Sequence, residues 1–144
     1  MADQIKKKLR LRIVTPETVK DELDADMVIM RCNTGDLGVL PDHDTLSAVL
    51  DYGVLRIFDE GTEKRMAVFG GLAQIKQNVV TLLVNSAQWP GEINRVQVEN
   101  EIHDAQRRLQ EETDDVNLQK DSVNLRRSLV QLEVSSYPLI NKPE

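Results

Sequence analysis

The 144-residue sequence has few aromatic side chains, one cysteine and no cluster of metal-ligating residues. Aromatic residues make up 3% of the chain, too few for the stacking platforms that bind single-stranded nucleic acids. The single cysteine, Cys32, excludes an internal disulfide framework and a zinc site built on several thiolates. The two histidines, His43 and His103, lie far apart in the sequence. We therefore expect no metal and no cofactor.

Charge and hydropathy exclude two further classes of protein. The formal net charge of −6 argues against binding to a phosphate backbone, which requires a basic surface. No stretch approaches the roughly 18 consecutive apolar residues of a membrane span, and no signal-peptide-like run follows the lysines at residues 6–8. We expect a cytosolic, globular chain that reaches a membrane only through a protein partner.

Residues 1–90 show the two-residue period of β-strands. Leu9, Leu11 and Ile13 alternate with basic residues, which predicts a half-buried strand. Further short apolar segments, separated by turn residues, lie at residues 27–30, 53–58, 65–69, 72–76 and 79–84. The Gly70–Gly71 pair between two of them predicts a tight hairpin turn. Together these patterns predict an N-terminal antiparallel β-sandwich or barrel.

The pattern changes to a helical period after Gly91. Asn94 is a candidate helix cap, and residues 113–115 interrupt the period and offer a second cap. Apolar residues form one stripe on the first helix at Val98, Ile102, Ala105 and Leu109, and one on the second at Leu118, Leu125, Leu129 and Leu132. Pro138 ends the second helix. We predict an α+β chain in which residues 91–144 form a C-terminal antiparallel two-helix hairpin.

The predicted hairpin has little apolar surface with which to form a core. Burial of one leucine contributes about 1.5–3 kcal/mol. Ordering the backbone costs about 1–2 kcal/mol per residue, over some forty residues. Two interpretations stay open at this point: a weakly held hairpin that can dock, open or refold against a partner, and a simply packed helical appendage.

Several segments resemble, in the same order, the epsilon subunit of F-type ATP synthases. Residues 33–43, N-T-G-D-L-G-V-L-P-D-H, resemble the G-E-L-G-I-L-P-G-H element of that family. Other strands and turns of the family are matched by residues 11–17, 52–56, 68–75 and 79–83. The resemblance covers nearly the whole chain, including both the strand-rich front and the helical back.

The resemblance implies a noncatalytic rotor subunit in the central stalk of a bacterial ATP synthase, which couples ion-driven rotation to ATP synthesis. In the family, the β-sandwich binds the gamma subunit and the membrane c-ring. The C-terminal helices either fold on the sandwich or extend along gamma into the alpha/beta catalytic head, where they block ATP hydrolysis. The implied location is peripheral, on the cytoplasmic side of the cell membrane, without direct membrane insertion.

The resemblance also assigns residues to the c-ring interface. Gly35, Asp36, Gly38 and His43 match the family element that faces the c-ring loops, and Asp42 stands where the family usually has glycine. The two glycines would permit backbone conformations that a Cβ atom disfavours. The alternatives are an ordinary turn aspartate at residue 36 and a solvated loop histidine at residue 43.

Two arginine pairs punctuate the acidic helical region. Arg107, Arg108, Arg126 and Arg127 match the family's C-terminal basic residues, which face an acidic segment of the catalytic head. The alternative is a solvated helix face with local ion pairs, such as one between Asp104 and Arg108.

A nucleotide-binding stretch of the family is degenerate in this sequence. Some bacterial members bind ATP through an I-D-x-x-R-A stretch at the start of the first helix. Ile93, Asn94, Gln97 and Val98 occupy the four defined positions here. Because Gln97 cannot supply the charged fork that binds phosphate, we expect weak ATP binding or none.

Two other functions remain as alternatives. One is a free-standing binding module with a different partner. The other is a small hydrolase that uses His43 with Asp42 or Asp44, although no nucleophile or metal spacing accompanies these residues. The chain also lacks the phosphate-binding loop of an ATPase.

Overall fold

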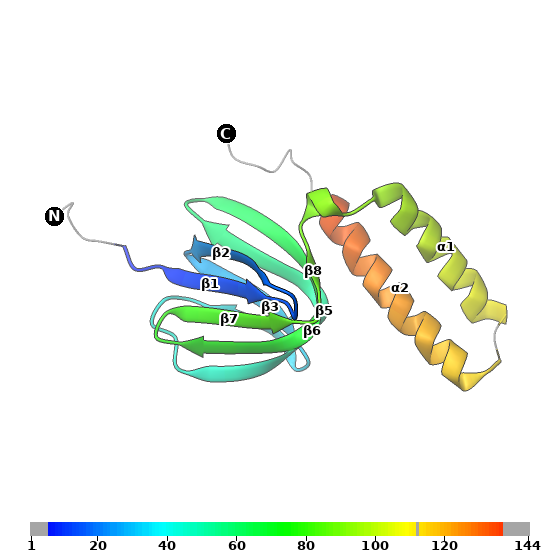
Figure 1. Cartoon of the computed structure of the whole chain (residues 1–144), viewed down its shortest axis with the longest axis horizontal. Helices are drawn as coiled ribbons and strands as arrows, with labels where there is room; N and C mark the ends of the chain where they lie inside the picture. Colours follow the sequence, from blue (N-terminus) through cyan, green and yellow to red (C-terminus); the bar gives the residue numbers. More distant parts are fainter. Residues whose placement is uncertain (1–5, 112, 137–144) are drawn as a thin grey trace.

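A computed structural model of the chain describes residues 6–111 and 113–136. These residues form a β-sandwich followed by two helices, which confirms the predicted fold class (Figure 1). The elements in chain order are β1 Leu9–Val14, β2 Val19–Ala25, β3 Met27–Cys32, β4 Gly35–Val39, β5 Leu46–Asp59, β6 Thr62–Lys76, β7 Val79–Val84, β8 Ala87–Gln88, the 3₁₀ helix η1 Pro90–Glu92, α1 Arg95–Glu111 and α2 Asp115–Ser136.

One long hairpin, β5–β6, organises the sandwich. The strands follow the order β2-β1-β7-β6-β5-β3-β4, and β8 adds to β6. Strands β5 and β6 have 14 and 15 residues and pair from Leu46↔Ile75 to Asp59↔Thr62. All pairings are antiparallel except that of β1 with β7, which is parallel.

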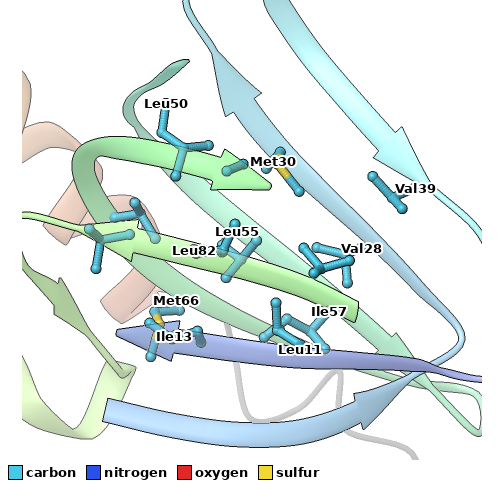
Figure 2. Packing of buried hydrophobic residues seen from close by; sticks show 14 of the residues in the cluster. Leu11, Ile13, Val28, Met30, Val39, Leu50, Leu55, Ile57, Met66 and Leu82 are labelled. Carbon is cyan, nitrogen blue, oxygen red and sulfur yellow. The ribbon is translucent and has the colours of Figure 1, made fainter. Parts of the chain in front are cut away.

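The core lies between the two layers of strands. Leu9, Leu11 and Ile13 are at most 1% exposed, as their alternation with basic residues predicts. Side chains from several strands, including Leu55 and Leu82, point toward one another in the interior (Figure 2). Cys32 is a buried free thiol whose pKa is raised by burial. Burial of each large apolar side chain of the core, such as Leu11 or Leu55, stabilises the fold by about 1.5–3 kcal/mol.

The prediction of a hairpin turn at Gly70–Gly71 is wrong. Both glycines lie within the continuous strand β6, with φ angles of 79° and 140°. A Cβ atom on Gly71 would lie 2.1 Å from the carbonyl oxygen of Leu83 on β7. The pair therefore bends β6 and allows close backbone approach, at the point where its partner changes from β8 to β7.

Side-chain caps begin both helices, as predicted. The backbone N–H of Gln97 donates to Asn94 Oδ1 at 3.1 Å, and that of Val116 donates to Asp114 Oδ1 at 2.9 Å. The predicted helix stop, Pro138, lies outside the described residues.

The apolar stripe predicted for α2 is partly wrong. On α1, Val98, Ile102 and Ala105 are buried as expected. On α2, Leu129 is 45% exposed. The buried residues of α2 are Asp121, Ser128, Gln131 and Val134. A single-stripe pattern fails here because α2 has two neighbours, α1 and the sandwich, and reaches both partly through polar side chains (Figure 1).

The geometry at Gly71 predicts a large loss of stability on adding one methyl group. Gly71→Ala places Cβ against the β7 backbone at an unfavourable φ, so we expect a loss of about 2–4 kcal/mol in the free energy of unfolding. Urea denaturation followed by circular dichroism measures this change. The matched control is Gly91→Ala, where a Cβ atom meets nothing within 4 Å. Equal stability of the two variants would contradict the prediction.

Candidate functional site

A row of exposed apolar side chains crosses three neighbouring strands. Val49 of β5 pairs with Leu72 of β6, which pairs with Leu83 of β7. These three residues, the apolar row, are 49%, 53% and 49% exposed. They line an open groove of about 560 Å³ that also includes Gly35 and Asp36. An exposed apolar patch with a polar rim is typical of a protein-interaction surface.

The β3–β4 turn forms one rim of this groove. Gly35 has a φ of 120°, which favours glycine. Asp36 is exposed and lies 3.3 Å from Arg31, its cross-strand neighbour. Gly38, farther along β4, is also exposed. The carboxylate of Asp36 is therefore at the surface but is already paired within its own sheet.

His43 lies in the β4–β5 loop, beyond the opposite end of β4 from Gly35. Its Nδ1 is 2.8 Å from the carbonyl oxygen of Asp44, so this ring nitrogen contacts backbone rather than a carboxylate. That contact gives no support to the hydrolase alternative. The loop is fixed by Asp42, whose N–H donates to Asn78 Oδ1 at 2.5 Å while Asn78 Nδ2 donates back at 3.3 Å.

The conformation of Asp42 explains why glycine suits this position. Its φ of 68° lies in the left-handed region, which glycine adopts without steric cost. The Asp42 carboxylate offsets that steric cost by accepting a hydrogen bond from Asn78 and by forming an ion pair with Lys7. The distance from Lys7 Nζ to Asp42 Oδ2 is 2.8 Å. The hydrogen bond from Lys7 contributes most, and the one from Asn78 adds to it, in lowering the pKa of Asp42 below its usual range.

An ion-pair cluster joins the start of β1 to the β5–β6 turn. Asp26, Asp59 and Glu60 place carboxylate oxygens within 4.8 Å of one another. Lys8 Nζ contacts all three residues, including Glu60 at 2.5 Å and Asp26 at 3.4 Å. The lysine ammonium thus supplies the positive charge among these carboxylates, and we interpret the group as structural rather than metal-binding.

The two arginine pairs have different surroundings. On α1, Arg107 pairs with Asp104 at 3.7 Å, and Arg108 pairs across the hairpin with Asp121 at 3.3 Å. Arg126 and Arg127 on α2 instead contact the sandwich. The structure thus brings one pair to the hairpin and the other to the β5–β6 ladder.

The degenerate nucleotide stretch has structural roles. Ile93 packs against the small cluster of Ala67, Phe69 and Val134 that joins α2 to the sandwich. Asn94 caps α1, and Val98 is buried in the hairpin. Gln97 Nε2 donates to Glu101 Oε1 at 3.2 Å.

Sequence reasoning missed the apolar row because its members continue apolar runs. Val49 precedes buried Leu50, Leu72 precedes buried Ala73, and Leu83 follows buried Leu82. An unbroken apolar run on a strand of an antiparallel sheet indicates that both faces carry apolar side chains. That signal was present, and the cross-strand register was needed to align the three runs.

Comparisons with known proteins agree with this architecture. Residues 8–90 match the family model of the ATP synthase delta/epsilon chain β-sandwich domain. The chloroplastic ATP synthase epsilon chain of Nephroselmis olivacea is 42% identical over 91 residues, covering 63% of this chain and 68% of the relative. The epsilon chain of Bacillus licheniformis is 31% identical over 129 residues, covering 90% and 98%. The chain belongs to the ATP synthase epsilon family.

Solved structures share the fold at low sequence identity. A chain of the Euglena gracilis mitochondrial ATP synthase matches with a TM-score of 0.77 and 21% identity, covering 92% of this chain and 84% of that one. A chain of the central stalk and c-ring of the Tetrahymena thermophila mitochondrial ATP synthase matches with a TM-score of 0.64 and 14% identity. The match covers 92% of this chain and 100% of that one. Among the described residues, neither helix is long and apolar enough to cross a membrane.

The ion-pair cluster predicts a loss of stability in acid. The Glu60 backbone N–H and the neighbouring lysines lower the pKa of Asp26, and Lys8 lowers the pKa of Glu60. Because both pKa values are lowered by folding, the stabilisation is complete above about pH 5 and is lost as the pH falls through the lowered values. We expect the urea concentration at the midpoint of unfolding to decrease as the pH is lowered from about 5 to about 3. The Asp26→Asn variant should show a smaller decrease over the same pH range.

The control for this titration is Asp104→Asn, which changes an exposed aspartate on α1. It should leave the slope of the urea midpoint against pH unchanged. A wild-type midpoint that stayed constant over the same range would show that the cluster contributes no pH-dependent stability.

Proposed function

We propose that this chain is a noncatalytic rotor subunit of the central stalk of an ATP synthase. It couples ion-driven rotation of the c-ring to ATP synthesis through the gamma subunit, and it inhibits ATP hydrolysis through its C-terminal helices. It reaches the cytoplasmic side of the cell membrane peripherally, through the c-ring. The observation that carries the proposal is a β-sandwich of the epsilon family with an exposed apolar row and a two-helix hairpin held at one end.

The apolar row is the proposed contact surface for gamma. Val49, Leu72 and Leu83 expose about half of each side chain on one face, in direct register. Burial of one such side chain against a partner contributes about 1.5–3 kcal/mol. Three adjacent residues therefore supply an apolar centre for a stable interface, and the groove beside them offers room for a partner's side chains.

The β3–β4 turn and the β4–β5 loop are the proposed contacts with the c-ring. Strand β4 supplies Gly35, Asp36 and Gly38, and the loop after it supplies His43. Asp36 presents a carboxylate at the surface, and this carboxylate can exchange its exposed ion pair with Arg31 for a contact with a basic or polar group of a c-ring loop. The Asp42–Asn78 clip holds the loop in a fixed conformation beside the β6–β7 turn.

The hairpin is the proposed inhibitory element. Arg107 and Arg108 have side chains about half or more exposed on α1 and are available to acidic groups of the catalytic head. Arg126 and Arg127 become available to the same head when α2 leaves the sandwich. We propose further that the start of α1 binds ATP weakly or not at all. Ile93 packs against the sandwich, Asn94 caps α1, Gln97 pairs with Glu101, and Val98 is buried.

Leu72→Arg tests the gamma interface. The substitution places a charge in the apolar row, so we expect the affinity for gamma to fall about 10- to 100-fold, as measured by titration of purified gamma. The matched control is Val19→Arg, at a 46% exposed position on the edge strand β2. Undiminished binding of the Leu72 variant would exclude this face, and failure of the unmodified chain to bind gamma would favour a module with another partner.

Removal of the hairpin tests inhibition. A chain that ends at Gly91 lacks both helices and keeps the apolar row. We expect faster ATP hydrolysis by the complex assembled with this chain than by the complex assembled with the full chain. Co-elution with gamma should persist and shows that the shortened sandwich is folded. Equal hydrolysis rates with co-elution retained would contradict the inhibitory role.

A further inference from the structure

The hairpin is attached to the sandwich through the C-terminal half of α2. Figure 1 shows α2 beside β5, β6 and β8, with α1 on its outer side. The apolar part of this contact is one small cluster, in which Tyr52, Val54, Ile93 and Val130 pack against the buried residues Ala67, Phe69 and Val134. Gln131 Nε2 adds a hydrogen bond of 2.7 Å to Gln88. Polar and cationic contacts beside this small cluster add to the attachment.

Each of the two arginines of α2 contacts one aromatic ring, Arg126 that of Tyr52 and Arg127 that of Phe69. The Arg126 guanidinium lies 5.4 Å from the centroid of the Tyr52 ring, and its Nη2 is 2.6 Å from Asp51 Oδ1. The Arg127 guanidinium lies 3.9 Å from the centroid of the Phe69 ring. Both distances are within the range of cation–π attraction.

The two rings contact each other on one face of the β5–β6 hairpin. Tyr52 of β5 and Phe69 of β6 are cross-strand partners, with ring centroids 5.7 Å apart and planes at 70°. These are two of only five aromatic residues in the chain. Phe69 is 1% exposed, and its cover includes Arg127, whose Nη1 also reaches Ser86 Oγ at 3.4 Å. Separation of α2 therefore uncovers both rings and frees both guanidinium groups together.

We propose that Arg126 and Arg127 form a catch that sets how often the hairpin leaves the sandwich. The catch consists of the two arginines, the Tyr52–Phe69 ring pair and the Asp51 carboxylate. A cation–π contact shifts an equilibrium by about two- to thirtyfold, and a partly exposed ion pair by about fivefold or less. The inference concerns the isolated chain and does not rest on the proposed place in an ATP synthase.

A thiol placed under α2 measures the detached population directly. Ala67 is fully buried in the contact with Val134, so the cysteine of Ala67→Cys reacts with a thiol reagent only when α2 detaches. Cys32 is buried in the sandwich core, away from that small cluster, and its reaction reports unfolding of the sandwich itself. Peptide mass spectrometry separates the two labelling rates, and their ratio in the full chain is the readout.

The expected results are graded. In the Ala67→Cys chain, Asp51→Asn should speed labelling at position 67 about two- to fivefold, because it removes the ion pair. Arg126→Ala should speed it more than Asp51→Asn does, because it removes both the ion pair and the cation–π contact with Tyr52. Arg127→Ala should speed it about two- to thirtyfold, and the double alanine variant at least tenfold. Lysine at both positions keeps the charge but loses the flat guanidinium, and should give an intermediate rate.

Arg107→Ala is the matched control, because it removes an arginine from α1 that pairs with Asp104. It should leave both labelling rates unchanged. A double alanine variant with a position-67 rate within twofold of its parent would overturn the proposal. So would a parallel rise in Cys32 labelling, since the arginines would then stabilise the whole fold rather than the docked position of the hairpin.

Discussion

The continuous β5–β6 ladder is the constraint on which the rest of the structure depends. It pairs along nearly its whole length, from Leu46↔Ile75 to Asp59↔Thr62, and β3, β7, β8 and α2 contact it directly. On one side of the Gly70–Gly71 bend, Val49 and Leu72 begin the apolar row. On the other side, Tyr52 and Phe69 receive the arginines of α2. One ladder thus carries both proposed functional surfaces.

The two parts of the chain are stabilised by different forces. The sandwich buries large apolar side chains from β1, β3, β5, β6 and β7 in one cluster, so its stability follows apolar area. The hairpin buries Asp121, Ser128 and Gln131 among its few inward residues. Contacts of this kind give specificity of position with little net energy, because the polar groups lose water when they pair. This difference in stabilising forces supports the proposal that the hairpin moves while the sandwich keeps its fold.

The sequence predicted the features that depend on neighbouring residues. The alternation of Leu9, Leu11 and Ile13 and the caps at Asn94 and Asp114 are local signals, and the structure has them as expected. Features that depend on distant partners were misread or missed. The Gly70–Gly71 pair resembles a turn until β7 is seen to approach it, and Leu129 resembles a core residue until α2 is placed between two neighbours. The interface roles of Asp36 and His43 stay predictions.

Because α2 is attached to the sandwich through its C-terminal half, its N-terminal half can act as a lever arm. Glu92 bonds the Trp89 N–H and pairs with Lys20, so the chain is fixed to the sandwich up to η1. Residues 115–125 of α2 precede its arginine contacts with the sandwich and extend about 16 Å. A tilt of about 10° at Arg126 would displace the far end of α2 by about 3 Å, roughly half of one helical pitch. Small rotations beside the sandwich therefore become displacements of a few Å at the hairpin tip.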